Sequence, residues 1–227
     1  MRRLAALLGG IFALWLALAS PLAGMDHHLL TAHMAQHLLL MTVAAPLIML
    51  GAPAIVFPRG TIHPVICWLS GTSVVIGWHL PALFALGMST AGWHAFEQAT
   101  FFIAGLLFWR PVIQPKGCPP WGIPIYLFLA TLPCDTLSAF LTFCGRVVYP
   151  QYLSMPRDFI SPLADQELAG AMMWVSVTFA YLAPAVAVTI QLLSPQAVTS
   201  SQKPRCTGSL APNRVSKLDE NHSLPLP

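Results

Sequence analysis

Six long apolar runs constrain this chain more than any other feature of its sequence. About 20 apolar residues are needed to cross the roughly 30 Å hydrocarbon core of a bilayer, and a charge within such a run is costly. The runs are apolar on every face, whereas strands of a membrane barrel alternate in polarity. They cover residues 4–23, 29–57, 64–87, 93–113, 121–144 and 168–193. The sequence therefore predicts an all-α membrane bundle of about six transmembrane helices.

The composition excludes water-soluble and nucleic-acid-binding proteins. Only 8% of the 227 residues are charged, against roughly 25% in soluble domains, so polar side chains are too few to cover a soluble globule. The formal net charge of +3 comes from scattered residues and forms no basic stripe. The five cysteines contain no CxxC pair and are odd in number, which argues against a disulfide framework.

Basic residues predict which side of the membrane each loop faces, because Lys and Arg concentrate in cytoplasmic loops. A cytoplasmic N-terminus places nine of them inside and leaves only Arg146 and Arg157 outside. The nine are Arg2, Arg3, Arg59, Arg110, Lys116, Lys203, Arg205, Arg214 and Lys217. We therefore expect both termini in the cytoplasm.

Composition also divides the chain into three parts. Residues 1–23 are either a first transmembrane helix or a cleavable signal peptide, since two arginines precede the apolar stretch and small residues precede Ser20. Residues 24–193 form the helix bundle. Residues 194–227 are rich in Ser, Pro, Asn and Lys, which predicts a polar, disordered cytoplasmic tail.

Ionisable residues gather toward the outer ends of the helices, where they indicate a functional site by default. Of the eight histidines, only His63 and His222 fall on the cytoplasmic side. His79 and Asp135 each lie about 21 Å along an outward-running helix, so we expect them to share a depth and to pair. The residues nearer the outer surface are His27, His28, His33, His37, His94, Glu97, Asp165 and Glu167.

A spacing typical of metal chelation begins the second run. His33, His37 and Met41 stand at i, i+4 and i+8, which places them on one helical face. Imidazole together with thioether sulfur suits copper, especially the cuprous ion. Nearby carboxylates are expected to orient the imidazoles. The expected metal ligands are His33, His37, His94, His79 and Met41, and the expected supporting residues are Glu97, Asp135 and Asp165.

The same residues also have purely structural interpretations. A histidine at a helix mouth, such as His27, is commonly an interfacial residue. His79 precedes a proline by two positions and suits a helix-packing hydrogen bond, and Asp135 suits a cap on a proline kink. The remaining methionines suit packing. Three carboxylates suit first-turn positions stabilised by a helix N-terminus, namely Glu97, Asp165 and Glu167.

Four separated motifs follow one another along about residues 31–193. The first is His33-Met34-Ala35-Gln36-His37-Leu38-Leu39-Leu40-Met41, which continues to Leu50-Gly51-Ala52-Pro53, and the second is Trp78-His79-Leu80-Pro81. The third is His94-Ala95-Phe96-Glu97-Gln98 with Phe108-Trp109-Arg110-Pro111. The fourth is Asp165-Gln166-Glu167-Leu168-Ala169-Gly170, which leads into Met173-Trp174-Val175. In this order they resemble the CtaG family of cytochrome c oxidase assembly factors.

The resemblance implies a polytopic membrane protein that matures caa-type or related haem–copper oxidases at the step that furnishes the copper B centre. The implied partners are oxidase subunits and other copper-delivery proteins, and the implied metal is copper. The chain has six expected spans where family members often have one more, so the oxidase it serves is left open. No nucleophile with a base and no phosphate-binding loop is evident, so we favour an assembly factor or metallochaperone over an enzyme.

Two other classes stay open. Histidines on different helices at matched depth, with His37 and His79 as candidates, can ligate a haem iron axially. A metal transporter requires ionisable residues across the whole bilayer, and here the inner half offers only His63 near the surface.

Overall fold

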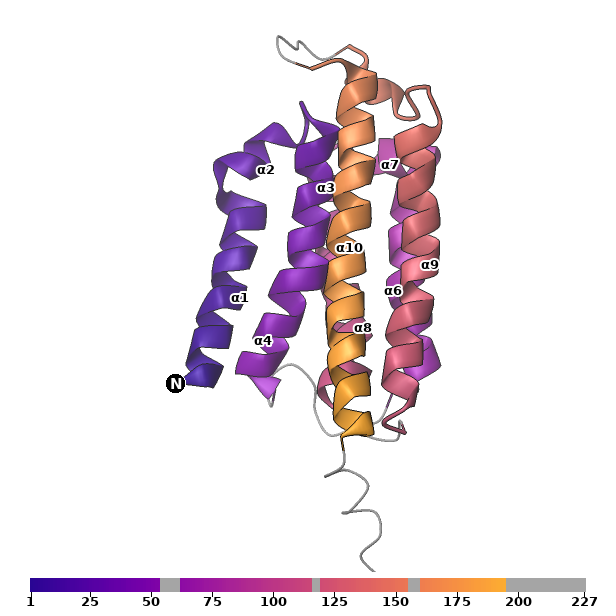
Figure 1. The fold of residues 1–227 in the computed structure, drawn as a ribbon. Coiled ribbons are helices and arrows are strands. Elements are labelled where there is room, and N and C mark those ends of the chain that lie inside the picture. The colour runs from indigo at the N-terminus through magenta and orange to yellow at the C-terminus, as the bar shows by residue number, and fades with distance from the viewer. Residues whose placement is uncertain (54–61, 116–118, 155–159, 195–227) are drawn as a thin grey trace, which may run out of the picture. The chain divides into compact units, whose positions relative to one another are not determined.

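Each apolar run of the sequence is helical in the computed structural model, which describes residues 1–53, 62–115, 119–154 and 160–194 (Figure 1). Met1–Leu193 form one compact unit, and Ser194–Pro227 are a separate unit. The expected disordered tail falls almost wholly outside the described residues. In chain order the elements are α1 Arg2–Ala19, α2 Pro21–Met25, α3 Leu30–Leu38, the π-helix η1 Leu39–Ala44, α4 Ala45–Gly51, α6 Pro64–His79, α7 Pro81–Gly87, α8 Ala91–Ile113, α9 Gly122–Phe143, the 3-10 helix η2 Pro150–Tyr152, and α10 Pro162–Leu193.

The all-α membrane architecture is confirmed, with a smaller number of clear spans than expected. Within the described ranges four helical segments are long and apolar enough to cross a membrane, or five if the bent pair α6 and α7 is one span. The expected span at residues 93–113 is present as α8, a helix of 23 residues, but it is not among those segments. Its polar side chains, His94, Glu97 and Gln98 at one end and Arg110 at the other, lower its mean hydropathy.

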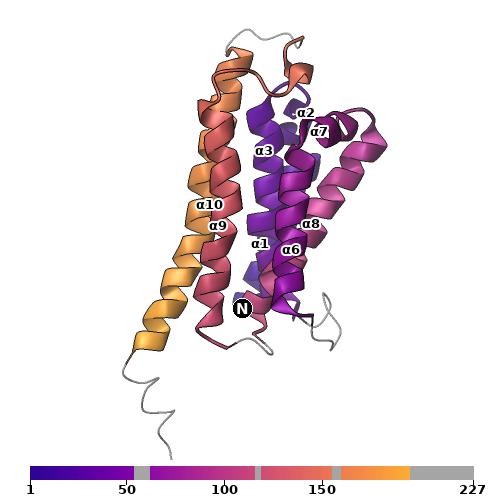
Figure 2. The ribbon, with the colours of Figure 1, turned by 90° about the vertical axis from the view of Figure 1, so that its right-hand side faces the viewer.

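The third run is not one straight helix. It bends by 84° between α6 and α7, so α7 turns across the end of the bundle (Figure 2). The residue before a proline is pushed out of the helical region, and Leu80, which precedes Pro81, has the extended angles φ −67° and ψ 130°. His79 is therefore the last residue of α6, at a helix end rather than within a continuous span.

The second run changes helical register just below the expected metal ligands. α3 ends at Leu38, and Leu39–Ala44 form a π-helix before α4 continues. A π-helix has slightly more residues per turn than an α-helix, but over the four residues from His37 this leaves Met41 on nearly the same side of the helix. His37 and Met41 line one small cavity together.

Small residues bring the helices close together. A Cβ atom on Gly105 of α8 would lie 2.9 Å from the Cα of Met41, and one on Gly170 of α10 would lie 2.9 Å from the carbonyl oxygen of Ser138 on α9. Such contacts are typical of membrane helices, where packing rather than the hydrophobic effect holds helices together. α9 and α10 run side by side (Figure 2).

α1 is packed into the same unit as the rest of the bundle. It lies against α4 and η1, and Gly10 of α1 faces Ile48 while Gly51 of α4 faces Leu7. The C-terminal end of α1, the start of α3, α7 and the connection from α9 to α10 all lie at the end opposite the N-terminus (Figure 1). The candidate site is built at that end.

Candidate metal centre

Three helices bring buried imidazoles and one carboxylate to the same place. α3 contributes His33 and His37, α6 ends at His79, and the first turns of α8 contribute His94 and Glu97. Glu97 and His33 are fully buried, and His37 and His79 are 5% exposed. Since an isolated buried charge is very costly, Glu97 must be compensated by the groups around it.

Glu97 stands at the centre of this group. Its Oε1 lies 3.4 Å from Nε2 of His33 and 3.6 Å from Nε2 of His37, and its Oε2 lies 3.5 Å from Nδ1 of His94. Ligand atoms about 2.0–2.1 Å from a tetrahedral metal stand roughly 3.3–3.4 Å apart. The three separations are therefore those of neighbouring metal ligands, and His33, His94 and Glu97 are grouped closely enough to hold one ion.

Most buried polar atoms of this cluster are not satisfied by hydrogen bonds. Neither ring nitrogen of His33 or His37 and neither carboxylate oxygen of Glu97 has a hydrogen-bond partner among the described residues. Leaving a buried polar group unsatisfied costs about 1–3 kcal/mol, and native structures rarely do so. A cation bound by these atoms would satisfy several of them together, so the donor set fits a metal ion.

Apolar side chains shape the walls of the cluster. His37 stacks on Phe101 with ring centroids 3.7 Å apart, and His33 meets Phe84 edge to face at 5.1 Å. Gly87 of α7 leaves the space that Glu97 fills, because a Cβ atom there would lie 2.7 Å from Oε2 of Glu97. The bend that places α7 across the end of the bundle thus sets the position of the carboxylate.

His79 and Met41 line a second, smaller cavity next to the cluster. This cavity has a volume of about 30 Å³, and His37 and Met34 also line it. Nδ1 of His79 lies 2.6 Å from the carbonyl oxygen of Val75 and Nε2 lies 3.2 Å from Sδ of Met34. A carbonyl only accepts, so Nδ1 carries the proton in the neutral ring and the lone pair of Nε2 faces the thioether. An imidazole nitrogen and a sulfur that both present lone pairs are suitable ligands for a soft metal ion.

The expected pairing of His79 with Asp135 is wrong. Oδ1 of Asp135 instead accepts a long hydrogen bond from the hydroxyl of Thr178 on α10, at 3.5 Å. Cys134 lines the small cavity. Since each residue turns an α-helix by about 100°, Asp135 is directed away from that cavity and toward α10.

Asp165 also lies outside the metal cluster. Its carboxylate caps the N-terminus of α3, where it accepts from the backbone N–H of Leu30 at 2.7 Å and of Thr31 at 3.1 Å and from the Thr31 hydroxyl at 2.7 Å. The first N–H groups of a helix have no intrahelical partner, so the Asp165 carboxylate serves as their hydrogen-bond acceptor. Asp165 is in the first turn of α10, so it holds the helix that carries His33 and His37 against α10.

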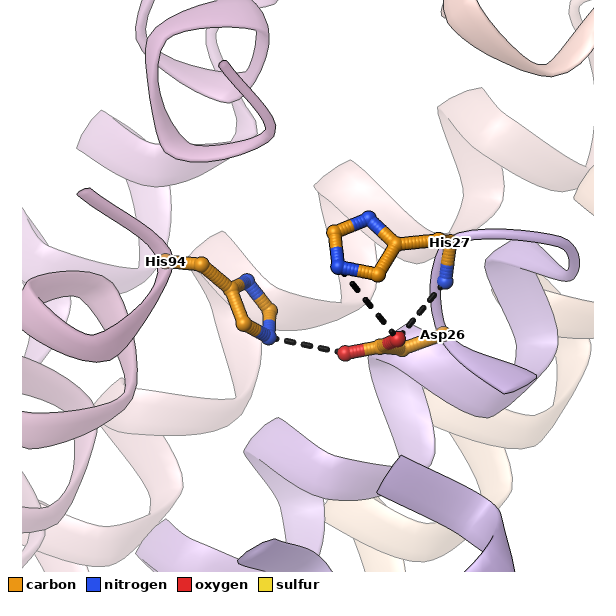
Figure 3. A group of neighbouring side chains, drawn as sticks. All are labelled: Asp26, His27 and His94. Atoms are coloured by element: carbon orange, nitrogen blue, oxygen red, sulfur yellow. Dashed lines mark hydrogen bonds and ion pairs between the residues drawn. The ribbon is translucent and has the colours of Figure 1, made fainter. Parts of the chain in front are cut away.

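Sequence reasoning missed Asp26, which joins the site from the connection between α2 and α3. Oδ2 of Asp26 lies 2.7 Å from Nε2 of His94 (Figure 3). The Tyr152 hydroxyl donates to the Asp26 carbonyl oxygen at 2.7 Å. Burial raises the pKa of Asp26, but the hydrogen bond from His94 and the nearby positive charges of His94 and His27 outweigh this effect and hold the pKa below its usual range. No spacing in the sequence links this loop residue to α8.

Comparisons with known proteins give one result that identifies the family. No curated protein and no solved structure matches the chain. The family described as cytochrome c oxidase caa3 assembly factor, Caa3_CtaG, matches residues 1–194, which include every described helix and the whole histidine cluster. The chain therefore belongs to the family of cytochrome c oxidase caa3 assembly factors.

Proposed function

We propose that this protein delivers copper to a haem–copper oxidase from the outer face of a bacterial inner membrane. The observation that carries the proposal is the buried cluster in which imidazoles of His33, His37 and His94 face the Glu97 carboxylate at 3.4–3.6 Å. Copper is the cargo of this cluster, which holds the ion and passes it to an oxidase subunit without catalysing a reaction.

The chemistry of the surrounding donors supports copper over harder cations. Imidazole suits copper and zinc, whereas thioether sulfur favours the cuprous ion. The small cavity next to the cluster adds the thioethers of Met34 and Met41 to the imidazole of His79. The negative charge of Glu97 offsets part of the positive charge of a copper ion, which lowers the cost of holding the ion in a buried position.

The small volume of the cavity disfavours the haem-binding alternative. The cavity between His37 and His79 has a volume of about 30 Å³, which suits an ion or one water molecule and not a porphyrin. His37 also stacks directly on Phe101 at 3.7 Å, which blocks one face of its ring.

The residues along α8 disfavour the transporter alternative. Arg110 lies 16 residues beyond His94 on α8, or about 24 Å along the helix, and it is buried there. Between Glu97 and Arg110 the sequence of α8 has no His, Cys, Asp or Glu that could pass a metal cation along, and a guanidinium is not a metal ligand.

The test is oxidase maturation in living cells. Membranes of a strain that lacks the gene, restored with wild type, with His33→Ala/His37→Ala or with the control His28→Ala, are assayed for oxidase activity and haem spectra. We expect loss of activity with haem retained in the deletion strain, rescue by wild type and by His28→Ala, and no rescue by the double variant. Full activity without the gene, or rescue by the double variant, would overturn the proposal.

A further inference from the structure

We propose that Asp26, His27 and His94 form a second metal site, an outer loading site, and that the ion passes from it to the buried cluster through His94. Its role in loading rests on the proposed function, whereas metal binding at the three residues does not. Neither Asp26 nor His27 belongs to the ligand set expected from the sequence.

The three side chains are arranged as neighbouring ligands. Oδ2 of Asp26 lies 2.7 Å from Nε2 of His94, and Oδ1 lies 3.9 Å from Nε2 of His27 (Figure 3). Adjacent ligands of a square-planar cupric ion stand roughly 2.8 Å apart, so Asp26 and His94 are already at ligand spacing. The His27 side chain is half-exposed, and its ring centroid lies 5.3 Å from that of His94. One carboxylate with two imidazoles suits Cu²⁺ or Zn²⁺.

The outer site has one half-exposed ligand, His27, beside the buried carboxylate of Asp26, whereas the buried cluster has none that is half-exposed. The side chain of His27 is 49% exposed and that of His94 is 15% exposed, but His33 and Glu97 are fully buried. Asp26, His27 and His94 line a cavity of about 580 Å³ together with two glutamines, Gln36 and Gln98. An ion can therefore reach these three residues first.

His94 links the two sites because its two nitrogens face opposite ways. Nε2 points to Asp26 at 2.7 Å, and Nδ1 points to Glu97 at 3.5 Å. When the ion is at the outer site, Nε2 of His94 is the ligand and the Nδ1–H group donates a hydrogen bond to Glu97. When the ion is at the buried site, Nδ1 of His94 is the ligand and the Nε2–H group donates a hydrogen bond to Asp26. Glu97 thus orients the His94 ring when the ion is at the outer site, and Asp26 orients it when the ion is at the buried site.

The transfer is a ligand exchange with no change of oxidation state. The ion releases Asp26 and His27 and binds His33 and Glu97, while the single proton of the neutral His94 ring moves from Nδ1 to Nε2. Because both sites use this ring, we infer that one chain holds one ion at a time at this pair of sites.

The competing explanation is a purely structural ion pair, in which a protonated His94 bridges Asp26 and Glu97. Titration of the purified full-length protein in detergent with Cu²⁺, followed by equilibrium dialysis and electron paramagnetic resonance, separates the two. The starting variant is His33→Gln/His37→Gln, which removes the buried ligands. Onto it are added Asp26→Asn/His27→Gln, His27→Gln alone, or the control His28→Gln, an exposed neighbour outside the three-residue group.

We expect the starting variant to retain one Cu²⁺ per chain with nitrogen hyperfine splitting. Asp26→Asn/His27→Gln should weaken its binding by at least about tenfold, His27→Gln should weaken it measurably, and His28→Gln should leave it unchanged. Since the His27 side chain is half-exposed, its single variant remains informative if the double variant does not fold. Absence of Cu²⁺ from the starting variant, or equal binding after His27→Gln, would overturn the loading site. No oxidase is present, so this result is independent of the maturation assay.

Discussion

Glu97 shows how one residue can define a buried metal site. A carboxylate without solvent is unfavourable unless positive charge or hydrogen bonds compensate it. Here three imidazoles surround Glu97 at 3.4–3.6 Å, and none of them makes a hydrogen bond to it. In the proposed function this carboxylate attracts a cation and supplies one of its ligands.

Glu97→Gln should weaken copper binding by roughly tenfold or more, because it removes the negative charge and keeps the shape of the side chain. Competition with a chromophoric copper chelator measures the affinity. Glu167→Gln is the matched control, since Glu167 is a half-buried carboxylate of α10 outside the cluster. Equal affinities of the Glu97→Gln and Glu167→Gln proteins would contradict a ligand role.

Gly87→Ala should displace Glu97 without unfolding the bundle. The added Cβ atom would lie 2.7 Å from Oε2 and 3.1 Å from Cδ of Glu97, so the carboxylate must move away from the histidines. Copper affinity should fall while the circular dichroism spectrum is unchanged. Gly77→Ala is the control, because its Cβ atom would meet only the Leu83 side chain at 3.9 Å. A Gly87→Ala protein with wild-type affinity would show that the position of Glu97 does not matter.

At the scale of the element, interruptions of regular helix build the site. The break at Leu80 turns α7 so that Gly87 faces Glu97, and the π-helix that follows α3 sets the register of Met41. η2 brings Tyr149 and Tyr152 over the same end, where their hydroxyls bind the carbonyl oxygens of His79 and Asp26 at 2.9 and 2.7 Å. Straight helices of the same sequence would not bring these groups together.

Asp165→Ala should destabilise the protein by roughly 1–3 kcal/mol, because buried N–H groups at the start of α3 lose their acceptor. Thermal unfolding in detergent, followed by circular dichroism, should show a lower Tm. The matched control is Glu167→Ala, two residues further along α10. If both variants unfold at the same temperature, the cap does not stabilise α3.

A neighbouring pair of glycines tests how α1 packs. A Cβ atom on Gly10 would lie 2.6 Å from Cγ1 and 2.9 Å from the backbone nitrogen of Ile48, whereas one on Gly9 would meet only Leu47 at 3.5 Å. Gly10→Ala should therefore separate α1 from α4 and lower the Tm, and Gly9→Ala should not. Equal Tm values would argue that α1 is not packed against α4 in the membrane.

At the scale of the whole molecule, the polar groups are sorted to one end. The buried acidic side chains of the described residues, Asp26, Glu97 and Asp165, all lie at the end that carries the histidines. The distribution of Lys and Arg predicts that this end faces outward. Under the proposed function, an outward-facing site would receive metal before the protein meets the oxidase.

Cysteine labelling in whole cells tests this orientation. In a variant with the five native cysteines replaced by alanine, His28→Cys should react with a membrane-impermeant maleimide in intact spheroplasts. Lys203→Cys, in the tail, should react only after the membrane is opened. The reverse pattern would place the histidine cluster on the cytoplasmic side and contradict delivery from the outer face.

The sequence by itself determined the helical class and the gathering of histidines at one end. Long uncharged apolar runs leave no alternative to membrane helices, and residues that begin outward-facing helices must share a leaflet. The spacing of His33 and His37 within one α-helix was likewise sufficient to place them on one face. These properties depend on one segment at a time.

Only the tertiary structure decided which side chains meet. The pairing of Asp26 with His94, of His79 with Met34 and of Asp165 with α3 depends on how far each helix is rotated about its own axis and where it breaks. A periodic pattern describes one helix and contains no information about the rotation of its neighbour. One residue along an α-helix corresponds to a rotation of about 100° about the helix axis, which is enough to direct a side chain such as Asp135 to a neighbouring helix instead of the cavity. Packing between the helices fixes the rotation of each helix about its axis.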